Sequence, residues 1–501
     1  MQIEFRNIWL ISLIERLRPD LCKKFPIDNC GERPGFAAWL VTNGVKEYKA
    51  LLSNADFLNC INRVDQTTGL SVLQRLVYEA RPDVQAAYPL SKGIDAILRW
   101  FECHGNEEHN LLPLQTTSPV SCRPIIQYPF GVNLIGYVYG QLGIGEDLRM
   151  AARAMLAAGI PFTLIDFPPG KDIPQNDRSL ANYVSTQGHY AINIFCMTAL
   201  EHGRYYAEKG LQQIEGRYNI GYWPWELSNW PEEWLDLTQL VDEVWVSTQH
   251  TYDALKAVSD VPIFIMPMAV ELGEIRDFGS GNAVRRWFDL PDKATLFCFS
   301  FDLNSSIHRK NPQACVDAFL QAFPIESFNA EQVGLVIKVH KPKRLNRAWE
   351  KLKQLSAMDG RIHIIEQTLS RPDLLALYQS CDCFLSLHRA EGFGRGIAEA
   401  LQLGLHVITT GYSGNVDFCY QPFADLVSYK LVKVKKGQYP FATNQVWADV
   451  NVDHAAGLMR SYYDNRLSNS GIQNDWLQFS AEQVGRRYKD RLLSLMGFLG
   501  I

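Results

Sequence analysis

The sequence predicts an α/β protein with two parallel sheets, each covered by helices on both faces. From residue 131 to about 270, short apolar stretches typical of buried strands alternate with helix-length stretches. The same alternation starts again at residue 295 and continues to about 410. Glycine-rich turns follow strands in both series, and open α/β sheets bind ligands at that edge. Two such sheets indicate two facing domains with a substrate cleft between them.

Each expected element rests on a local pattern. In the first series we expect strands within residues 132–137, 161–167, 190–197, 218–225 and 241–248, and a helix over 147–159 that ends at a glycine. In the second series we expect strands within 295–302, 333–339, 361–367, 381–388 and 405–410, with helices that start at Pro312 and near Arg395. The tail, residues 475–500, has the pattern of one long amphipathic helix.

These patterns divide the chain into four regions. We expect a helical N-terminal extension over 1–125, a first Rossmann-like domain over 126–280, a second over 281–465, and a C-terminal helix within 466–501. The polar, proline-bearing stretch at 115–124 is typical of a linker. A polar, glycine-bearing break at 275–292 marks the boundary between the two α/β domains.

Composition excludes some classes of function. The chain is 47% hydrophobic and 21% charged, as globular proteins are, and its formal net charge of −5 argues against nucleic-acid binding. The 11 cysteines show no metal-ligand spacing, so we expect reduced thiols, no metal site and a cytoplasmic protein. Residues 1–20 have the pattern of an amphipathic helix and of neither a signal peptide nor a membrane span. That helix either contacts the inner face of a membrane peripherally or, more simply, packs on its own domain.

The most informative motif is HRAEGFGRGIAEALQLG at 388–404. Glu391 precedes a glycine turn that lets backbone approach a ligand, and the helix after the turn offers free N–H groups to an anion. Glu399 lies one turn into that helix, off the apolar stripe, where its carboxylate can accept hydrogen bonds from a ribose diol. The structural alternative is a surface ion pair between Arg395 and Glu399, worth about 0.3–0.5 kcal/mol, which does not require so many glycines.

A second loop between strand and helix, FDLNSSIHRKNP at 301–312, places two cations before a helix. Arg309 and Lys310 lie at the positive end of that helix's dipole, which is unfavourable unless the cations share an anion. Two solvated surface cations are the alternative. We also expect Lys338, at the end of a neighbouring strand, and the turn at 413–415 to lie beside the glutamate site.

Two first-domain motifs are candidates for the opposite wall of the cleft. In GYVYGQLGIGE, Gly140, Gly143 and Gly145 form a loop that admits phosphate or sugar to the backbone, although turn formation alone would explain them. Their spacing is not the G-x-G-x-x-G of dinucleotide-binding folds. GYWPWELSNWPEEW at 221–234 suits an aromatic wall for a sugar, with Trp225 and Glu226 as candidates, and a packed core loop is the close alternative.

Together these motifs resemble retaining glycosyltransferases of the GT4 family, which have the GT-B architecture of two facing Rossmann-like domains. EGFGRGIAE at 391–399 matches the family's E-x7-E pattern, and RKNP at 309–312 is a second match. TTGYSGNVDF at 409–418 and the two first-domain motifs resemble a bacterial branch that builds surface polysaccharides. The resemblance covers residues 130–460, about two-thirds of the chain, with five motifs in the expected order.

The resemblance implies a role for each motif. Glu391 and the amides of Gly392 to Gly394 would contact the donor sugar, Glu399 the ribose, and Lys310 with Arg309 the diphosphate leaving group. The first-domain glycine loop would close on the donor phosphates or the acceptor, and the C-terminal helix would cross back onto the first domain. The implied partners are a UDP- or GDP-sugar donor, as co-substrate with no other cofactor, and a glycan or lipid-linked glycan acceptor.

The candidate site residues follow from these roles. The candidate catalytic residues are Lys310, Arg309 and Glu391. The candidate donor-binding residues are Glu399, Gly392, Phe393, Gly394, Arg395, Gly396, Lys338, Ser413, Gly414 and Asn415, and those of the phosphate and acceptor loops are Gly140, Gly143, Gly145, Trp225 and Glu226. Many family members have an arginine where this chain has Ser300 to Asp302, and a small or apolar residue where it has Arg395. Arg395 therefore either adds a phosphate contact or marks an altered donor.

The expected function is metal-independent, retaining transfer of a sugar to a hydroxyl acceptor, in the synthesis of O-antigen, capsule or exopolysaccharide. One alternative is a GT-B sugar-nucleotide epimerase, which would share the nucleotide site but need no acceptor wall. The other is a catalytically silent relative that keeps the fold for binding in a biosynthetic complex. Glu391, Glu399 and Lys310 are all present, which favours activity over silence.

Overall fold

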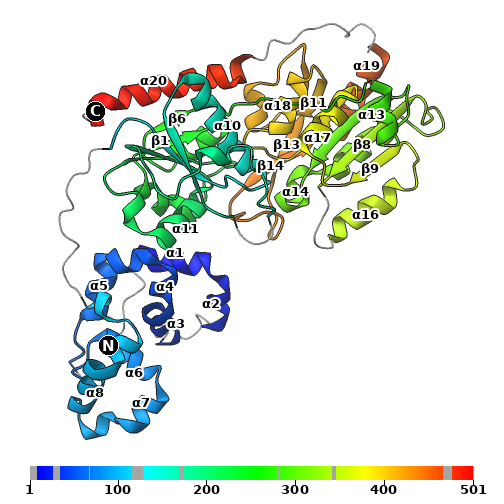
Figure 1. Cartoon of the computed structure of the whole chain (residues 1–501). Helices are drawn as coiled ribbons and strands as arrows, with labels where there is room; N and C mark the ends of the chain where they lie inside the picture. Colours follow the sequence, from blue (N-terminus) through cyan, green and yellow to red (C-terminus); the bar gives the residue numbers. More distant parts are fainter. Residues whose placement is uncertain are drawn as a thin grey trace.

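The computed structural model describes residues 8–25, 34–66, 68–115, 128–169, 173–279, 281–340, 346–465 and 477–499. These form a helical N-terminal region, two six-stranded parallel sheets with their helices, and a C-terminal helix (Figure 1). The fold class expected from the sequence is confirmed. The expected boundaries near 125, 280 and 465 fall at or beside gaps in the described residues, and the linker expected at 115–124 lies outside them except for Gln115.

The first sheet has the strand order β2-β1-β3-β4-β5-β6. Its strands are β1 Val132–Gly136, β2 Phe162–Asp166, β3 Ile192–Cys196, β4 Tyr218–Tyr222, β5 Glu243–Val246 and β6 Ile263–Ile265, and its helices α10 Gly143–Ala158, α11 Ala199–Lys209 and α12 Gln249–Lys256. All five residues of β1 are buried, as parallel strands covered on both faces must be. The chain goes from β1 to β2 on one side and to β3 on the other, so the switch point lies between β1 and β3.

The second sheet has the order β12-β11-β10-β7-β8-β9. Its strands are β7 Thr295–Phe301, β8 Val333–Val339, β9 Ile362–Glu366, β10 Cys383–Ser386, β11 His406–Thr410 and β12 Ala424–Val427. Its helices are α13 Gly281–Trp287, α14 Ile307–Lys310, α15 Pro312–Ala322, α16 Arg347–Ser356, α17 Arg371–Gln379, α18 Arg395–Gln402 and α19 Val452–Asn465. Here the switch point lies between β7 and β10, whose carboxyl ends carry the two cations and the glycine-rich turn.

An antiparallel ribbon, which the sequence patterns did not indicate, extends the second domain. Strands β13 Tyr429–Lys433 and β14 Val446–Val450 pair with each other and not with the main sheet. The segment between them reaches the first domain, because Gln445 Nε2 donates to the carbonyl oxygen of Asn229 at 2.7 Å and Gln445 Oε1 accepts from the Asn229 N–H at 3.0 Å. The ribbon therefore joins the two domains beside the cleft.

The N-terminal region is helical, as expected, and lies against the first domain (Figure 1). Its helices are α1 Trp9–Leu17, α2 Pro19–Lys24, α3 Pro34–Trp39, α4 Val45–Glu47, α5 Ala55–Asn62, α6 Val72–Glu79, α7 Pro82–Ala87, α8 Asp95–Trp100 and α9 Asn106–Glu108. The apolar face of α1 is buried, and Trp9 stacks on Tyr206 of α11 with ring centroids 5.4 Å apart. The amphipathic pattern at the start of the chain thus packs on the protein itself. Among the described residues, no helix has both the length and the apolar character needed to cross a membrane.

The C-terminal helix α20, Ala481–Leu499, crosses back onto the first domain as expected. It runs along α10, and the two helices touch so closely that a Cβ on Gly485 would lie 2.2 Å from the carbonyl oxygen of Ala154. The buried ring of Tyr488 packs against Trp245, with centroids 5.0 Å apart. Because a glycine permits this approach, α20 can cover the first domain along its length (Figure 1).

Candidate active site between the two domains

A cavity of about 510 Å³ lies between the two α/β domains. The first domain lines it with Leu142, Gly143, Ile144, Asp147, Ile173, Pro224, Glu226, Ser247 and Met268. The second domain lines it with Phe299, Ser300, Asp302, Ser305, Arg309, Lys310, Phe384, Ser386 and Glu391 through Ile397. The second-domain side follows the carboxyl ends of β7 and β10, where the switch point of the sheet places a binding crevice.

The two cations and the first glutamate of the sequence motifs meet at one end of this cavity. Nη1 of Arg309 lies 3.0 Å from Oε2 of Glu391, and Lys310 Nζ bonds the other oxygen of the same carboxylate. Arg309 also donates to the carbonyl oxygen of Ala390 at 2.8 Å, while its Nε is buried without a partner among the described residues. These three side chains are therefore one charged cluster rather than solvated surface groups.

Burial and charge compete within this cluster. Burial alone would raise the pKa of Glu391, but the charges of Arg309 and Lys310 outweigh burial and hold that pKa well below its usual value. Burial lowers the pKa of Lys310, although the Glu391 charge opposes the change. An anion bound beside Lys310 would favour its charged form further.

The glycine turn after Glu391 touches both domains. Gly394 has φ +94°, a left-handed conformation that suits glycine, and α18 begins at the next residue. From the first domain, Thr248 Oγ1 donates to the carbonyl oxygen of Gly392 at 2.7 Å. A Cβ on Gly392 would lie 2.7 Å from the carbonyl oxygen of Trp225, so only glycine fits there. The first residues of α18 line the cavity beside this turn, and a helix start in such a place suits an anion.

Ser413, Gly414 and Asn415 support this turn from behind. Ser413 Oγ accepts the Glu391 N–H at 2.8 Å, and the Gly414 N–H donates to the Glu391 carbonyl oxygen at 2.9 Å. Asn415 is fully buried and bonds His388 Nε2 at 3.0 Å. These residues were expected beside the glutamates, and the structure places them there as supports of the backbone, while Gly392 to Gly394 form the cavity wall.

Glu399 lies in α18 with a side chain only 4% exposed. Its Oε1 accepts from Arg371 Nη1 at 2.7 Å, and Arg371 also donates to the carbonyl oxygen of Glu271 at 3.3 Å. The surface pair with Arg395 that the sequence offered as an alternative is not what Glu399 forms. Instead Arg395 reaches the first domain, where its Nε lies 3.2 Å from Oδ1 of Asp147 on α10.

The first-domain glycines differ from the loop expected at 140–145. Helix α10 already begins at Gly143, so Gly143 and Gly145 belong to its first turn and only Gly140 stays in the loop. Gly143 lines the cavity, whereas a Cβ on Gly145 would lie 2.4 Å from the carbonyl oxygen of Gly140. Arg149 donates to that same carbonyl oxygen at 3.1 Å. Gly145 thus allows the loop to pack on the helix, and Gly143 faces the cleft.

The tryptophans of the 221–234 motif form a packed cluster. Trp223, Trp225, Trp230 and Trp234 are each no more than 3% exposed, and Trp225 and Trp234 meet edge to face at 4.9 Å. This is the packed-core alternative that the sequence left open, with Trp225 inside the cluster. Glu226 alone of the two candidates lines the cavity, where its Oε1 lies 3.9 Å from Nη2 of Arg309.

Gly396 lines the cavity, whereas Lys338 is not among its lining residues. Lys338 is 7% exposed on β8, and burial lowers its pKa while the charge of Asp302 opposes the change. Asp302 and Ser300 line the cavity. Gly396 is in the first turn of α18 and lines the cavity directly.

Three charged or polar residues of the site carried no sequence signal. Asp147 and Arg371 stand in ordinary helical stretches, and Tyr439 stands in the segment between β13 and β14. Tyr439 donates its hydroxyl to Glu226 Oε2 at 2.9 Å. Each of them meets its partner across the fold, so no local pattern indicated it.

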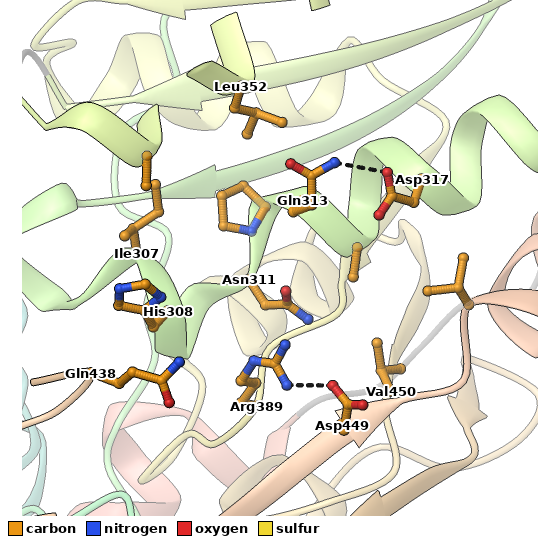
Figure 2. Close-up of a pocket in the computed structure, with 14 residues that line it drawn as sticks. Ile307, His308, Asn311, Gln313, Asp317, Leu352, Arg389, Gln438, Asp449 and Val450 are labelled. Atoms are coloured by element: carbon orange, nitrogen blue, oxygen red, sulfur yellow. Dashed lines mark hydrogen bonds and ion pairs between the residues drawn. The ribbon is translucent and has the colours of Figure 1, made fainter. Parts of the chain in front are cut away.

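A second cavity, of about 360 Å³, is lined by Ile307 and His308 of α14 and by residues that include Arg389 and Asp449 (Figure 2). Figure 2 shows the Arg389 and Asp449 side chains pointing toward each other, and Gln313 bonded to Asp317. Arg389 Nη1 donates to Asp449 Oδ1 at 2.5 Å. The Arg389 N–H donates to the carbonyl oxygen of Arg309 at 2.7 Å. This bond therefore fixes the backbone that carries the cation pair.

Comparisons with known proteins agree with this geometry. The family model described as glycosyl transferases group 1 matches residues 305–421, which include the cation loop and the E-x7-E turn. No curated protein matches the sequence of the chain. Among solved structures, Anabaena Alr3699/HepE in complex with UDP-glucose is similar at TM-score 0.52 and 13% identity, over 73% of this chain and 100% of that one.

Two other solved structures are similar over comparable lengths. A glycosyltransferase from Rickettsia africae ESF-5 is similar at TM-score 0.51 and 14% identity, over 74% of this chain and 99% of that one. The N-terminal domain of Candida albicans trehalose-6-phosphate phosphatase is similar at TM-score 0.50 and 11% identity, over 74% and 98%. The protein therefore has the GT-B fold, and residues 305–421 of its second domain match the family model of the group 1 glycosyl transferases.

Proposed function

We propose that the protein transfers a sugar from a nucleoside diphosphate sugar to a hydroxyl acceptor with retention of anomeric configuration. The observation that carries this proposal is the cluster of Arg309, Lys310 and Glu391 at the switch point of the second sheet, beside the start of α18. A diphosphate fits there, since two cations and free helical N–H groups favour an anion. The match of residues 305–421 and the UDP-glucose bound to Alr3699/HepE support the same reading.

In this proposal each group of site residues has a separate role. Arg309 and Lys310 neutralise the departing diphosphate, which is the task a metal ion performs in other transferases. Glu391 and the turn at 392–394 hold the sugar, and Glu399 takes the ribose together with Arg371. The bond from the sugar's anomeric carbon to the diphosphate oxygen breaks, and the acceptor oxygen attacks from the same face. The acceptor's hydroxyl proton goes to the departing diphosphate, so we assign no side-chain nucleophile.

The proposed setting follows the sequence resemblance. The acceptor is a glycan or lipid-linked glycan, and the product belongs to a cell-surface polysaccharide such as O-antigen, capsule or exopolysaccharide. The reaction would take place in the cytoplasm, where nucleotide sugars are made. UDP and GDP donors both agree with the charged cluster, because it addresses the diphosphate and not the base.

The first test is thermal-shift binding of UDP, GDP and their sugar conjugates. A ligand at about 100 times its dissociation constant should add roughly 2.7 kcal/mol to the free energy of unfolding. We expect one nucleotide series to stabilise the protein, and Glu399→Ala to weaken that effect because the ribose loses its carboxylate. Glu331→Ala, an exposed glutamate of the same domain, is the matched control and should bind as the wild type does.

Turnover separates this proposal from its rivals. Release of the nucleoside diphosphate together with a new glycoside supports transfer. Conversion of the donor into its epimer would instead identify a sugar-nucleotide epimerase. Binding without consumption in the presence of a range of glycan acceptors would identify a silent GT-B protein, and absence of any nucleotide-induced shift would overturn the donor site itself.

A further inference from the structure

The Glu226 side chain lies where the first domain meets the glycine turn of the second. It follows β4 and lines the interdomain cavity. Its Cγ is 3.7 Å from the position a Cβ on Gly392 would take, so the side chain rests on the turn that follows Glu391. A sugar held by that turn would therefore have Glu226 as its neighbour from the opposite domain.

A tyrosine from the ribbon insertion holds one oxygen of this carboxylate. Tyr439 donates its hydroxyl to Glu226 Oε2 at 2.9 Å, and its ring packs against Trp225. The segment that carries Tyr439 is anchored at its other face, because Ser306 Oγ donates to the Gln438 carbonyl oxygen at 2.9 Å. Burial, and next the charge of Glu226, raise the pKa of Tyr439 well above its usual value, so the tyrosine keeps the proton it donates.

The second oxygen of Glu226 remains able to accept a hydrogen bond. Oε1 lies 3.9 Å from Nη2 of Arg309, beyond hydrogen-bond distance, and among the described residues it accepts no other bond. The Glu226 side chain is 26% exposed, in contrast to 10% for Glu391. One oxygen is thus fixed and the other is open to the cavity, which is a suitable arrangement for binding a hydroxyl.

The charges of the cluster indicate which sugars suit it. The two cations Arg309 and Lys310 are balanced by the two carboxylates of Glu391 and Glu226. A bound diphosphate would take up the positive charge, and the two carboxylates would then face the sugar. Neutral hydroxyl groups are good donors to carboxylates, whereas a sugar acid placed there would be repelled.

From these contacts we infer that Glu226 is a specificity residue for the donor sugar, and that Tyr439 is the positioning residue that holds it. Glu226 accepts a hydroxyl of a neutral sugar across the domain interface and disfavours a uronic acid in the same place. This inference rests on the proposed function, since it requires a nucleoside diphosphate sugar in the cavity.

The test compares bare nucleotide with its sugar conjugates by isothermal titration, in the base series that gives the thermal shift. For the uridine series the probes are UDP, UDP-glucose, UDP-galactose, UDP-N-acetylglucosamine and UDP-glucuronic acid. In Glu226→Gln and Tyr439→Phe we expect the tightest-binding neutral conjugate to bind 10-fold or more weakly. The first change removes the charge from the acceptor of the sugar hydroxyl, and the second removes the bond that holds that acceptor in place. UDP itself should bind within 2-fold of the wild type, and UDP-glucuronic acid should bind more tightly to Glu226→Gln.

Two exposed residues supply matched controls. Tyr429→Phe removes a hydroxyl from β13 of the same ribbon, and Glu232→Gln removes a carboxylate from the same first-domain loop. Both should bind every probe as the wild type does. Equal weakening of UDP and its conjugates, or unchanged binding of both, would overturn the inference while leaving the donor site in place. Failure of the wild type to bind any nucleotide would overturn the proposed function first.

Discussion

At the scale of single residues, the proposed reaction depends on the positive charge of Lys310. Its ammonium bonds Glu391 and lies at the expected position of the leaving diphosphate. Lys310→Met keeps the length of the side chain and removes the charge, while Glu391 retains Arg309 at 3.0 Å as a partner. We therefore expect the protein to fold, and kcat for donor consumption to fall by about 10²–10³-fold.

The measurement is steady-state release of nucleoside diphosphate. Lys433→Met, an exposed lysine of β13, removes the same charge outside the cavity and should leave kcat unchanged. Equal activity of Lys310→Met and the wild type would show that the leaving group is stabilised elsewhere. A rise in KM alone would mean that Lys310 binds the donor equally in ground and transition states.

A second residue, His202, should make the free energy of unfolding depend on pH. His202 is fully buried in α11, stacked on Phe195 with ring centroids 3.6 Å apart, and its two ring nitrogens have no partner among the described residues. Burial lowers its pKa to about 3. As pH falls below about 6.5 the unfolded chain takes up this proton before the folded one, so stability present at neutral pH is lost.

Between pH 6.5 and pH 5 the loss from His202 should be about 1.6 kcal/mol. We expect His202→Phe, which keeps the stacked ring and cannot titrate, to reduce the slope of unfolding free energy against pH over that interval. Urea denaturation at several pH values measures the slope. The slope does not depend on how much free energy of unfolding the larger phenylalanine ring costs, since that cost is the same at every pH. An unchanged slope would contradict the assignment of this pH dependence to His202.

At the scale of elements, the turn after β11 supports the turn after β10. Gly414 lies so close to its neighbour that a Cβ there would be 2.0 Å from the carbonyl oxygen of Gly392. Gly414→Ala must therefore displace backbone, and we expect it to lower the free energy of unfolding by about 1–3 kcal/mol and to weaken nucleotide binding. Gly457→Ala in α19 is a control that we expect to raise the free energy of unfolding instead. Nothing lies within 4 Å of its Cβ position, and alanine stabilises a helix by about 1 kcal/mol relative to glycine. Urea midpoints that move in the same direction for both variants would contradict this.

The helices and strands differ in how well the sequence predicted them. Five strands of each sheet, β1–β5 and β7–β11, the start of α15 at Pro312 and the start of α18 at Arg395 follow from local periodicity and glycine or proline signals. The short edge strands β6 and β12 were not predicted. The start of α10 at Gly143 did not, because two glycines in a first turn resemble a loop in sequence. The β13–β14 ribbon was missed since its lysine-rich first strand is exposed and lacks the apolar pattern of a buried strand.

Some contacts of the candidate site could likewise be predicted from the sequence, and others could not. Arg309, Lys310 and Glu391 could be placed together because both loops follow strands that flank a switch point, and topology alone brings those ends together. Tyr439 and Glu226 are 213 positions apart, and Arg395 and Asp147 are 248 apart. Such pairs depend on how one domain sits on the other, which is not encoded in any short stretch.

At the scale of the whole molecule, contacts between domains lie on both sides of the cavity. Beside α20, the Val270 N–H donates to the carbonyl oxygen of Phe479 at 2.8 Å, and Gln402 donates to the carbonyl oxygen of Val270 at 2.6 Å. On the other side, Gln445 is 3% exposed and bonds both backbone groups of Asn229. A nucleotide sugar that is enclosed by both domains therefore requires one of these sides to open.

The Gln445 side is the one we expect to open, because α20 covers the first domain continuously while Gln445 joins two loops. Gln445→Ala removes buried hydrogen bonds worth about 1–3 kcal/mol and leaves the C-terminal side intact. We expect a larger radius of gyration in small-angle X-ray scattering without nucleotide, a return toward the wild-type value when the bound nucleotide bridges the domains, and weaker nucleotide binding, since closure now costs more. Gln354→Ala, an exposed glutamine on α16, should change none of these. A radius equal to that of the wild type, with unchanged affinity, would place the opening at the Arg395–Asp147 pair instead, because that ion pair also joins the two domains at the cavity.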